Sequence, residues 1–148
     1  MVKIHKPKND DEFLEDVAMI IFVAGFRYDL VAKRWPLMKK AFQNFSINKV
    51  AILNEKDVEK LMHDKNMIKN RMKIEAVIEN AKLCKRIQQE HSTVLKAIQK
   101  IKNGYAENPL FNQSLEEFFV QFKRIGKVTS KWLASLHNAK GNHIEYKK

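Results

Sequence analysis

The sequence has little of what several common kinds of protein require. Its 148 residues include one cysteine, Cys84, together with three prolines and four glycines. One cysteine excludes an intramolecular disulfide and any cysteine-based zinc cluster, and so few prolines and glycines provide few of the turns of a β-rich fold. The longest apolar run, 17–26, is ten residues, which is too short to span a bilayer, and residues 1–11 lack a secretory hydrophobic segment. These absences favour a cytoplasmic protein.

Positive charge is what the sequence has in excess. Lys and Arg number 28 against 17 Asp and Glu, which gives a formal net charge of +11. Such an excess favours a polyanionic partner, most commonly nucleic acid. It is concentrated near the end of the chain, because residues 121–148 carry seven Lys or Arg and one acid. A hydrophobic fraction of 45% is typical of a globular chain with a core.

Hydrophobic residues recur at helical spacing, and no useful stretch alternates apolar with polar residues. Asn9 with Glu12, and Ser114 with Glu117, have the spacing of capping boxes that begin helices. The helices predicted cover residues 9–24, 27–34 with a restart at 36–45, 47–53, 55–63, 70–89, 92–104, 114–122 and 129–140. The sequence therefore predicts a compact all-α fold of about eight helices, in one domain over residues 1–148 whose main parts are 10–104 and 114–140.

Specific residues are expected to begin or break these helices. Pro36 cannot donate a backbone hydrogen bond, so the helix is expected to restart there. Ser92 is the predicted N-cap of the helix 92–104, and Gly104 is predicted to end it in a left-handed conformation. The stretch 105–113 is the clearest loop.

A short basic turn is predicted at 64–73, between two helices. Its cations gather at the start of the following helix, where free N–H groups and the helix dipole already provide positive charge. Cations placed there cost stability unless an anion is nearby, which points to a phosphate site. The residues predicted to contact phosphate are Lys69, Asn70, Arg71 and Lys73. The alternative interpretation is a solvated basic turn.

A second basic turn, at 122–129, follows an aromatic-rich helix and precedes another helix. It combines one glycine with three cations, so backbone amides and positive side chains lie together. That combination binds phosphate without reading base sequence. The residues predicted to bind DNA here are Lys123, Arg124, Gly126, Lys127 and Thr129.

Several co-linear runs carry a family resemblance. These are 24–28, 41–46, 49–51 and 57–61, followed by Asp64, Ile68, 71–74, Ala76, Ile78 and 80–81. Together they resemble DNA-3-methyladenine glycosylase I, over roughly residues 10 to 85, and a match of that length is more specific than a short motif. Residues 125–126 followed by 129–130 also resemble the helix-hairpin-helix of the wider glycosylase superfamily.

The resemblance implies a DNA glycosylase of base excision repair, a hydrolase that extracts a damaged base from duplex DNA into a pocket. It would cut the N-glycosidic bond of an alkylated purine such as 3-methyladenine. Tyr28 occupies the position of the family's pocket Trp and would stack on the base. Asp29 is the acid nearest to Tyr28 and could orient a water or steady a cationic base, and the alternative is an ordinary Asp in the first turn of a helix. The family's pocket Glu falls at Ile20. Glu145 lies in the tail where many superfamily enzymes place a catalytic Asp, and no catalytic residue is assigned.

Family members also carry N-terminal aromatics and the ligands of a structural zinc, which have no counterpart in this sequence. We therefore expect a short member that uses no metal or cofactor. The partner implied is double-stranded DNA with a damaged base. We also expect a monomer that binds no membrane and is associated with the nucleoid in the cytoplasm.

Two other functions stay open from the residues. Ile20 in place of the Glu allows a non-catalytic DNA-binding protein that retains the glycosylase fold. The two basic turns alone would serve an architectural protein that binds DNA through phosphate contacts. Tyr28 is equally suited to packing in the core.

Overall fold

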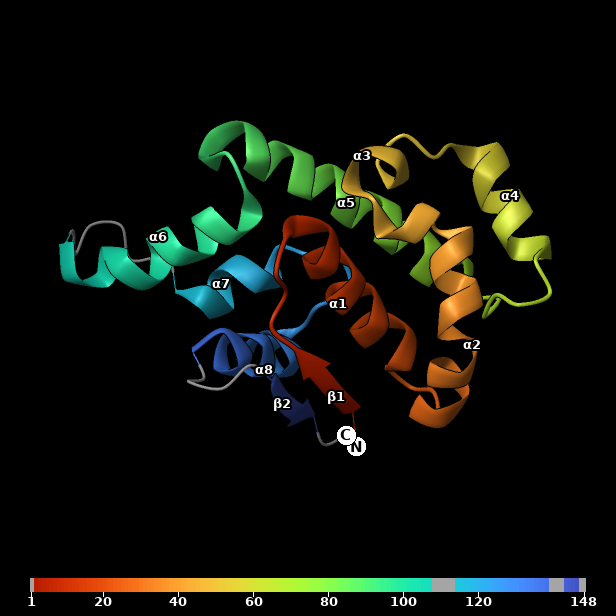
Figure 1. Cartoon of the computed structure of the whole chain (residues 1–148), viewed down its shortest axis with the longest axis horizontal. Coiled ribbons are helices and arrows are strands. Elements are labelled where there is room, and N and C mark those ends of the chain that lie inside the picture. The colour runs from red at the N-terminus through yellow and green to blue at the C-terminus, as the bar shows by residue number, and fades with distance from the viewer. Residues whose placement is uncertain (1, 108–113, 139–142, 147–148) are drawn as a thin grey trace. The chain divides into compact units, whose positions relative to one another are not determined.

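The computed structural model describes residues 2–107, 114–138 and 143–146. These residues form eight α-helices, one short 3-10 turn and a two-stranded sheet (Figure 1), which confirms the predicted all-α class. The chain divides into two compact units. The first unit is Pro7–Lys85, and the second unit is Met1–Lys6 with Arg86–Lys148. Among the described residues, no helix is both long and apolar enough to cross a membrane.

The first unit contains five helices and the 3-10 turn η1. In chain order these are α1 (Asp10–Val23), α2 (Tyr28–Ala41), η1 (Gln43–Phe45), α3 (Ile47–Val50), α4 (Glu55–His63) and the larger part of α5 (Arg71–His91). The predicted cap of α1 is confirmed, because Asn9 accepts a hydrogen bond from the Glu12 amide at 2.9 Å. Asn54 and Asp57 form a full capping box at α4.

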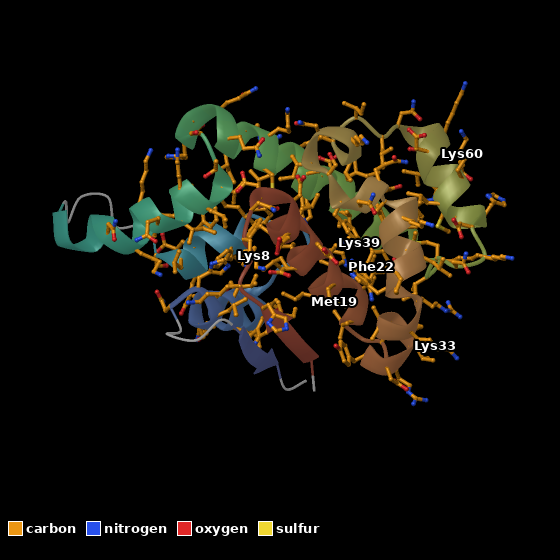
Figure 2. The ribbon with its side chains drawn as sticks, in the orientation of Figure 1. Lys8, Met19, Phe22, Lys33, Lys39 and Lys60 are labelled. Atoms are coloured by element: carbon orange, nitrogen blue, oxygen red, sulfur yellow. The ribbon has the colours of Figure 1, made fainter. Side chains whose placement is uncertain are left out.

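The core of the first unit is an aromatic cluster between α1, α2 and η1. Phe22 of α1 lies 6.3 Å from Trp35 of α2, between ring centroids. Phe45 of η1 stacks on Trp35 at 5.2 Å and on Phe42 at 5.3 Å. Figure 2 shows Phe22 on the side of α1 that faces α2, whereas Lys33 extends away from the ribbon.

The helix α2 corrects the prediction of a restart at Pro36. It is continuous from Tyr28 to Ala41 with Pro36 inside it. Val31, Trp35 and Met38 share its buried face, and this packing on both sides of the proline outweighs the missing backbone hydrogen bond. The helix also ends earlier than the predicted residue 45, because the three residues of η1 all have positive φ.

Two smaller corrections concern the ends of α3 and α6. α3 ends at Val50 rather than at residue 53. α6 (Val94–Glu107) is capped by Thr93, whose Oγ1 accepts from the Lys96 amide at 2.9 Å, and not by Ser92, which has φ +75°. Gly104 lies inside α6 and does not end it. Residues 105–107 of the predicted loop continue α6. The rest of that loop, 108–113, lies outside the described residues.

The second unit continues with α7 (Leu115–Val120) and α8 (Lys127–Asn138), which pack together. Ser114 caps α7 by accepting from the Glu117 amide at 3.1 Å, as predicted. The sequence predicted no strands, but β1 (Val2–His5) and β2 (His143–Tyr146) pair antiparallel, with Ile4 opposite Ile144 (Figure 1). Glu145, expected in an unstructured tail, lies in β2 opposite Lys3.

Candidate base pocket and nucleic-acid interface

The turn between α1 and α2 carries the two predicted pocket residues. Gly25 adopts φ +70°, a conformation that glycine accepts readily, and the Phe26 amide bonds the Val23 carbonyl at 2.9 Å. Tyr28 then begins α2 and is half-buried. Asp29 is exposed and forms an ion pair with Arg27 at 2.8 Å. Tyr28 therefore offers an aromatic face at a sharp turn, and the Asp29 carboxylate is engaged by Arg27.

Lys73 fixes the same turn from α5. Its side chain is buried, with 5% of the residue exposed. Its Nζ donates to the carbonyl of Ala24 at 2.6 Å and to that of Phe22 at 3.2 Å. A cation at these carbonyls neutralises the negative end of α1. The predicted phosphate contact of Lys73 does not fit this geometry, since the ammonium points into the protein.

The other residues of the first basic turn are also largely committed. Asn70 caps α5, with its Oδ1 accepting from the Lys73 amide at 3.1 Å. Arg71 forms ion pairs with three carboxylates, those of Glu55, Glu59 and Glu75. Lys69 is exposed. The carboxylates of α4 and α5 therefore neutralise Arg71, one of the cations from which the sequence predicted a phosphate site.

The second basic turn connects α7 to α8 and presents its polar residues to solvent. Phe122 and Ile125 anchor it, with 2% and 4% exposed. The predicted DNA contacts Lys123, Arg124, Gly126 and Lys127 are exposed, and Thr129 is half-buried. The left-handed residue is Arg124, with φ +63°, and not the glycine. A side chain built on Gly126 would meet no atom within 4 Å, so its backbone is openly accessible.

The start of α8 adds backbone donors to this turn. The Ser130 amide bonds the Gly126 carbonyl at 2.9 Å as the first hydrogen bond of the helix. The amides of the residues before Ser130 therefore lie at the open end of a helix of 12 residues, where the dipole is positive. Combined with the three cations, this geometry suits a phosphate group.

Asp16 is a residue that the sequence analysis missed. It lies on α1 one turn before Ile20, and its Oδ2 is buried with no hydrogen-bond partner. Burial raises the pKa of this carboxyl to about 8, and Glu15 and Glu12 add to the increase. The signal in the sequence was a lone acid within the apolar stretch of 13–23.

The remaining titratable groups of interest belong to the interior. Cys84 is fully buried, and burial raises the pKa of its thiol. His137 lies 5.2 Å from Phe119 between ring centroids. Burial, together with Lys102 and Lys6, lowers the pKa of His137 to about 4. Within the described ranges, His, Cys, Asp and Glu form no group of three or more that could hold a metal ion.

The sequence profile of the methyladenine glycosylase family matches residues 5–131, and the chain belongs to that family. It is 36% identical over 66 residues to DNA-3-methyladenine glycosylase 1 of Escherichia coli K12. That alignment covers 45% of this chain and 35% of the relative, so the chain matches about a third of its length.

Solved structures agree on the fold. A variant of 3-methyladenine DNA glycosylase I in complex with 3-methyladenine superposes with a TM-score of 0.76 at 20% identity, over 95% of this chain and 84% of that one. A variant of 3-methyladenine DNA glycosylase I from Staphylococcus aureus superposes with a TM-score of 0.63 at 24% identity. The superposition covers 70% of this chain and 55% of that one. The family resemblance and the helical fold predicted from the sequence are thereby confirmed.

Proposed function

We propose that this chain is a DNA glycosylase of base excision repair that hydrolyses the N-glycosidic bond of an alkylated purine such as 3-methyladenine. The observation that carries this proposal is the family match over 5–131, which includes both the α1–α2 turn and the α7–α8 turn. The substrate is double-stranded DNA with a damaged base, and the enzyme acts as a monomer in the cytoplasm, without a metal or cofactor.

The two turns have different tasks in this proposal. The α7–α8 turn holds the DNA backbone through its cations and the open end of α8, contacts that do not depend on base sequence. The damaged base leaves the stack, because its glycosidic bond is inaccessible inside the duplex. Tyr28 stacks on the extracted base, and a stacked aromatic ring contributes roughly 1–3 kcal/mol. A cationic alkylated purine already has a weakened bond, so positioning supplies much of the catalysis.

The test is release of free base from duplex DNA treated with a methylating agent. Wild type and Tyr28→Phe should both release base, because both keep the aromatic face, whereas Tyr28→Ala should lose release. Thermal unfolding of the three proteins controls for folding. Release by Tyr28→Ala at the wild-type rate would remove Tyr28 from the pocket. No release by wild type, with salt-sensitive DNA binding retained, would favour the non-catalytic DNA-binding protein.

A further inference from the structure

The acidic residues Asp11, Glu15 and Asp16 of α1 differ in their hydrogen bonds to the rest of the protein. Glu15 accepts hydrogen bonds from Trp35 Nε1 at 2.9 Å and from Lys39 Nζ at 3.0 Å. Asp11 accepts from the Ile47 amide at 2.9 Å. These bonds join α1 to α2 and α3. Asp16 is different, because its Oδ2 is buried and has no hydrogen-bond partner.

A buried oxygen of this kind destabilises the folded chain, since it loses its bonds to water without replacement. Buried polar groups in native proteins are nearly always hydrogen-bonded, so each exception calls for an explanation, and a role in binding or catalysis is one. Burial raises the pKa of Asp16 to about 8, so near neutral pH most molecules carry a protonated carboxyl. That carboxyl has one O–H donor beside one acceptor oxygen.

The position of Asp16 on α1 indicates what the partner is. Residues four apart lie on the same face of a helix, about 6 Å from each other along its axis. Asp16 and Ile20 therefore share a face, and Ile20 is the position at which the resemblance places the family's base-recognising acid. Glu15 and Phe22 lie on another side of α1, where they contact α2. Ile20 offers no hydrogen bond, whereas Asp16 offers two.

We propose that Asp16 is the residue that recognises the extracted base by hydrogen bonds, taking over the task that Ile20 cannot perform. This inference rests on the proposed function and deepens it. Adenine presents an N–H donor at N6 beside an acceptor at N7, whereas guanine presents acceptors at both O6 and N7. A protonated carboxyl, with its donor and acceptor side by side, complements the adenine edge and leaves one mismatch with guanine. Asp16 therefore selects alkylated adenine over alkylated guanine.

The experiment compares wild type, Asp16→Asn and Asp16→Leu in two assays. The first is equilibrium binding of free 3-methyladenine, with 3-methylguanine, which keeps its acceptors at O6 and N7, as the comparison base. The second is release of both bases from methylated duplex DNA. Asp16→Asn keeps a donor and an acceptor in the same place, so binding and release of 3-methyladenine should stay within a few-fold of wild type. Asp16→Leu should lose 3-methyladenine binding and release by a hundredfold or more, with its preference for adenine abolished.

The folding of the variants makes this result specific. Asp16→Leu should raise the melting temperature at pH 7, because it removes a buried polar group without a partner, whereas Asp16→Asn keeps a polar group there and should melt near the wild-type temperature. Loss of activity in a more stable protein separates recognition from a structural role. Glu79→Gln, at an exposed acid of α5 that bonds Lys82 at 3.3 Å, is the matched control and should change neither assay.

Each outcome decides between the two proposals. If Asp16→Leu binds 3-methyladenine as wild type does, or if wild type does not bind it, the role of Asp16 is wrong. Equal loss in Asp16→Asn and Asp16→Leu would also overturn recognition by a neutral hydrogen-bonding group. If wild type binds the base but releases none from DNA, the proposed catalysis fails, and the binding assay still decides on Asp16.

Discussion

Arg124 shows at the scale of one residue how the α7–α8 turn is built. Its φ of +63° is a conformation that costs a residue with a side chain roughly 1–2 kcal/mol relative to glycine. Gly126, two positions on, does not adopt a positive φ. An arginine at the strained position and a glycine at an unstrained one are the reverse of what stability alone would favour. The turn therefore presents a guanidinium at Arg124 and open backbone at Gly126, at a cost in stability.

Arg124→Gly should therefore separate stability from DNA binding. The melting temperature should stay the same or rise, because glycine relieves the strained φ. Affinity for duplex DNA should fall, and the slope of log K against log salt should decrease by about 0.9, the value for one lost phosphate contact. Ser92→Gly is the matched control, since Ser92 is exposed and also has a positive φ, of +75°. An unchanged salt slope in Arg124→Gly would remove Arg124 from the interface.

Asp16 predicts a dependence of stability on pH. Its pKa is about 8 in the folded chain, raised from the ordinary value of 3.8 that applies to the unfolded chain. Between these values the folded state keeps a proton that the unfolded state releases, so stability falls as pH rises. The wild type should lose roughly 1.4 kcal/mol per pH unit relative to Asp16→Asn between about pH 5 and 7. Urea unfolding of both proteins at several pH values measures this difference, and parallel curves would contradict it.

At the scale of elements, α5 is used to position the α1–α2 turn. Lys73 reaches from its first turn to two carbonyls at the end of α1, while Arg71 joins α5 to α4 through Glu55 and Glu59. Both side chains come from the first turn of α5. Lys73 holds the end of α1, and Arg71 holds α4. The basic cluster at the start of α5 therefore connects elements within the first unit.

Lys73→Met tests this structural role. It removes hydrogen bonds from a charged donor to buried carbonyls, and should lower the free energy of unfolding by about 2–3 kcal/mol. The salt dependence of DNA binding should not change, because the ammonium faces inward. Lys69→Met provides the contrast: Lys69 is exposed, so its loss should leave stability unchanged and reduce the salt slope if this turn contacts DNA. A reduced salt slope in Lys73→Met, with stability unchanged, would restore the phosphate contact.

At the scale of the whole molecule, the positive charge belongs mainly to the second unit. That unit has 13 Lys and Arg against five Asp and Glu, whereas the first unit has 15 against 12. The net charges are therefore +8 and +3. The unit that contains the α7–α8 turn consequently dominates the attraction to a polyanion over distances of about a Debye length.

The triple change Lys123→Gln, Arg124→Gln and Lys127→Gln should reduce the salt slope of duplex binding by up to about 2.7, at 0.9 for each phosphate contact. The control is Lys49→Gln, Lys56→Gln and Lys60→Gln, which removes the same charge from exposed positions of the first unit. Fluorescence anisotropy with duplex DNA at several salt concentrations measures both. Equal slopes for the two triple variants would mean that net charge, and not the α7–α8 turn, binds DNA.

Features that depend on neighbouring residues could be predicted from local pattern. The caps at Asn9, Asn54 and Ser114 could be predicted because a side chain bonds an amide three residues away. The helices α1, α4 and α5 followed from apolar periodicity combined with these local signals. The co-linear family resemblance identified the family, because it depends on the order of residues and not on their positions in space.

Features whose partners are distant in the sequence could be seen only in the folded chain. Trp35 and Phe45 stack across the end of α2, which stabilises a continuous helix through Pro36 and a left-handed η1. Lys73 bonds carbonyls 49 and 51 residues away. β1 and β2 pair from opposite parts of the chain, and the burial of Asp16 depends on packing around α1. Local pattern cannot predict such features, because their energies come from contacts that exist only once the chain has folded.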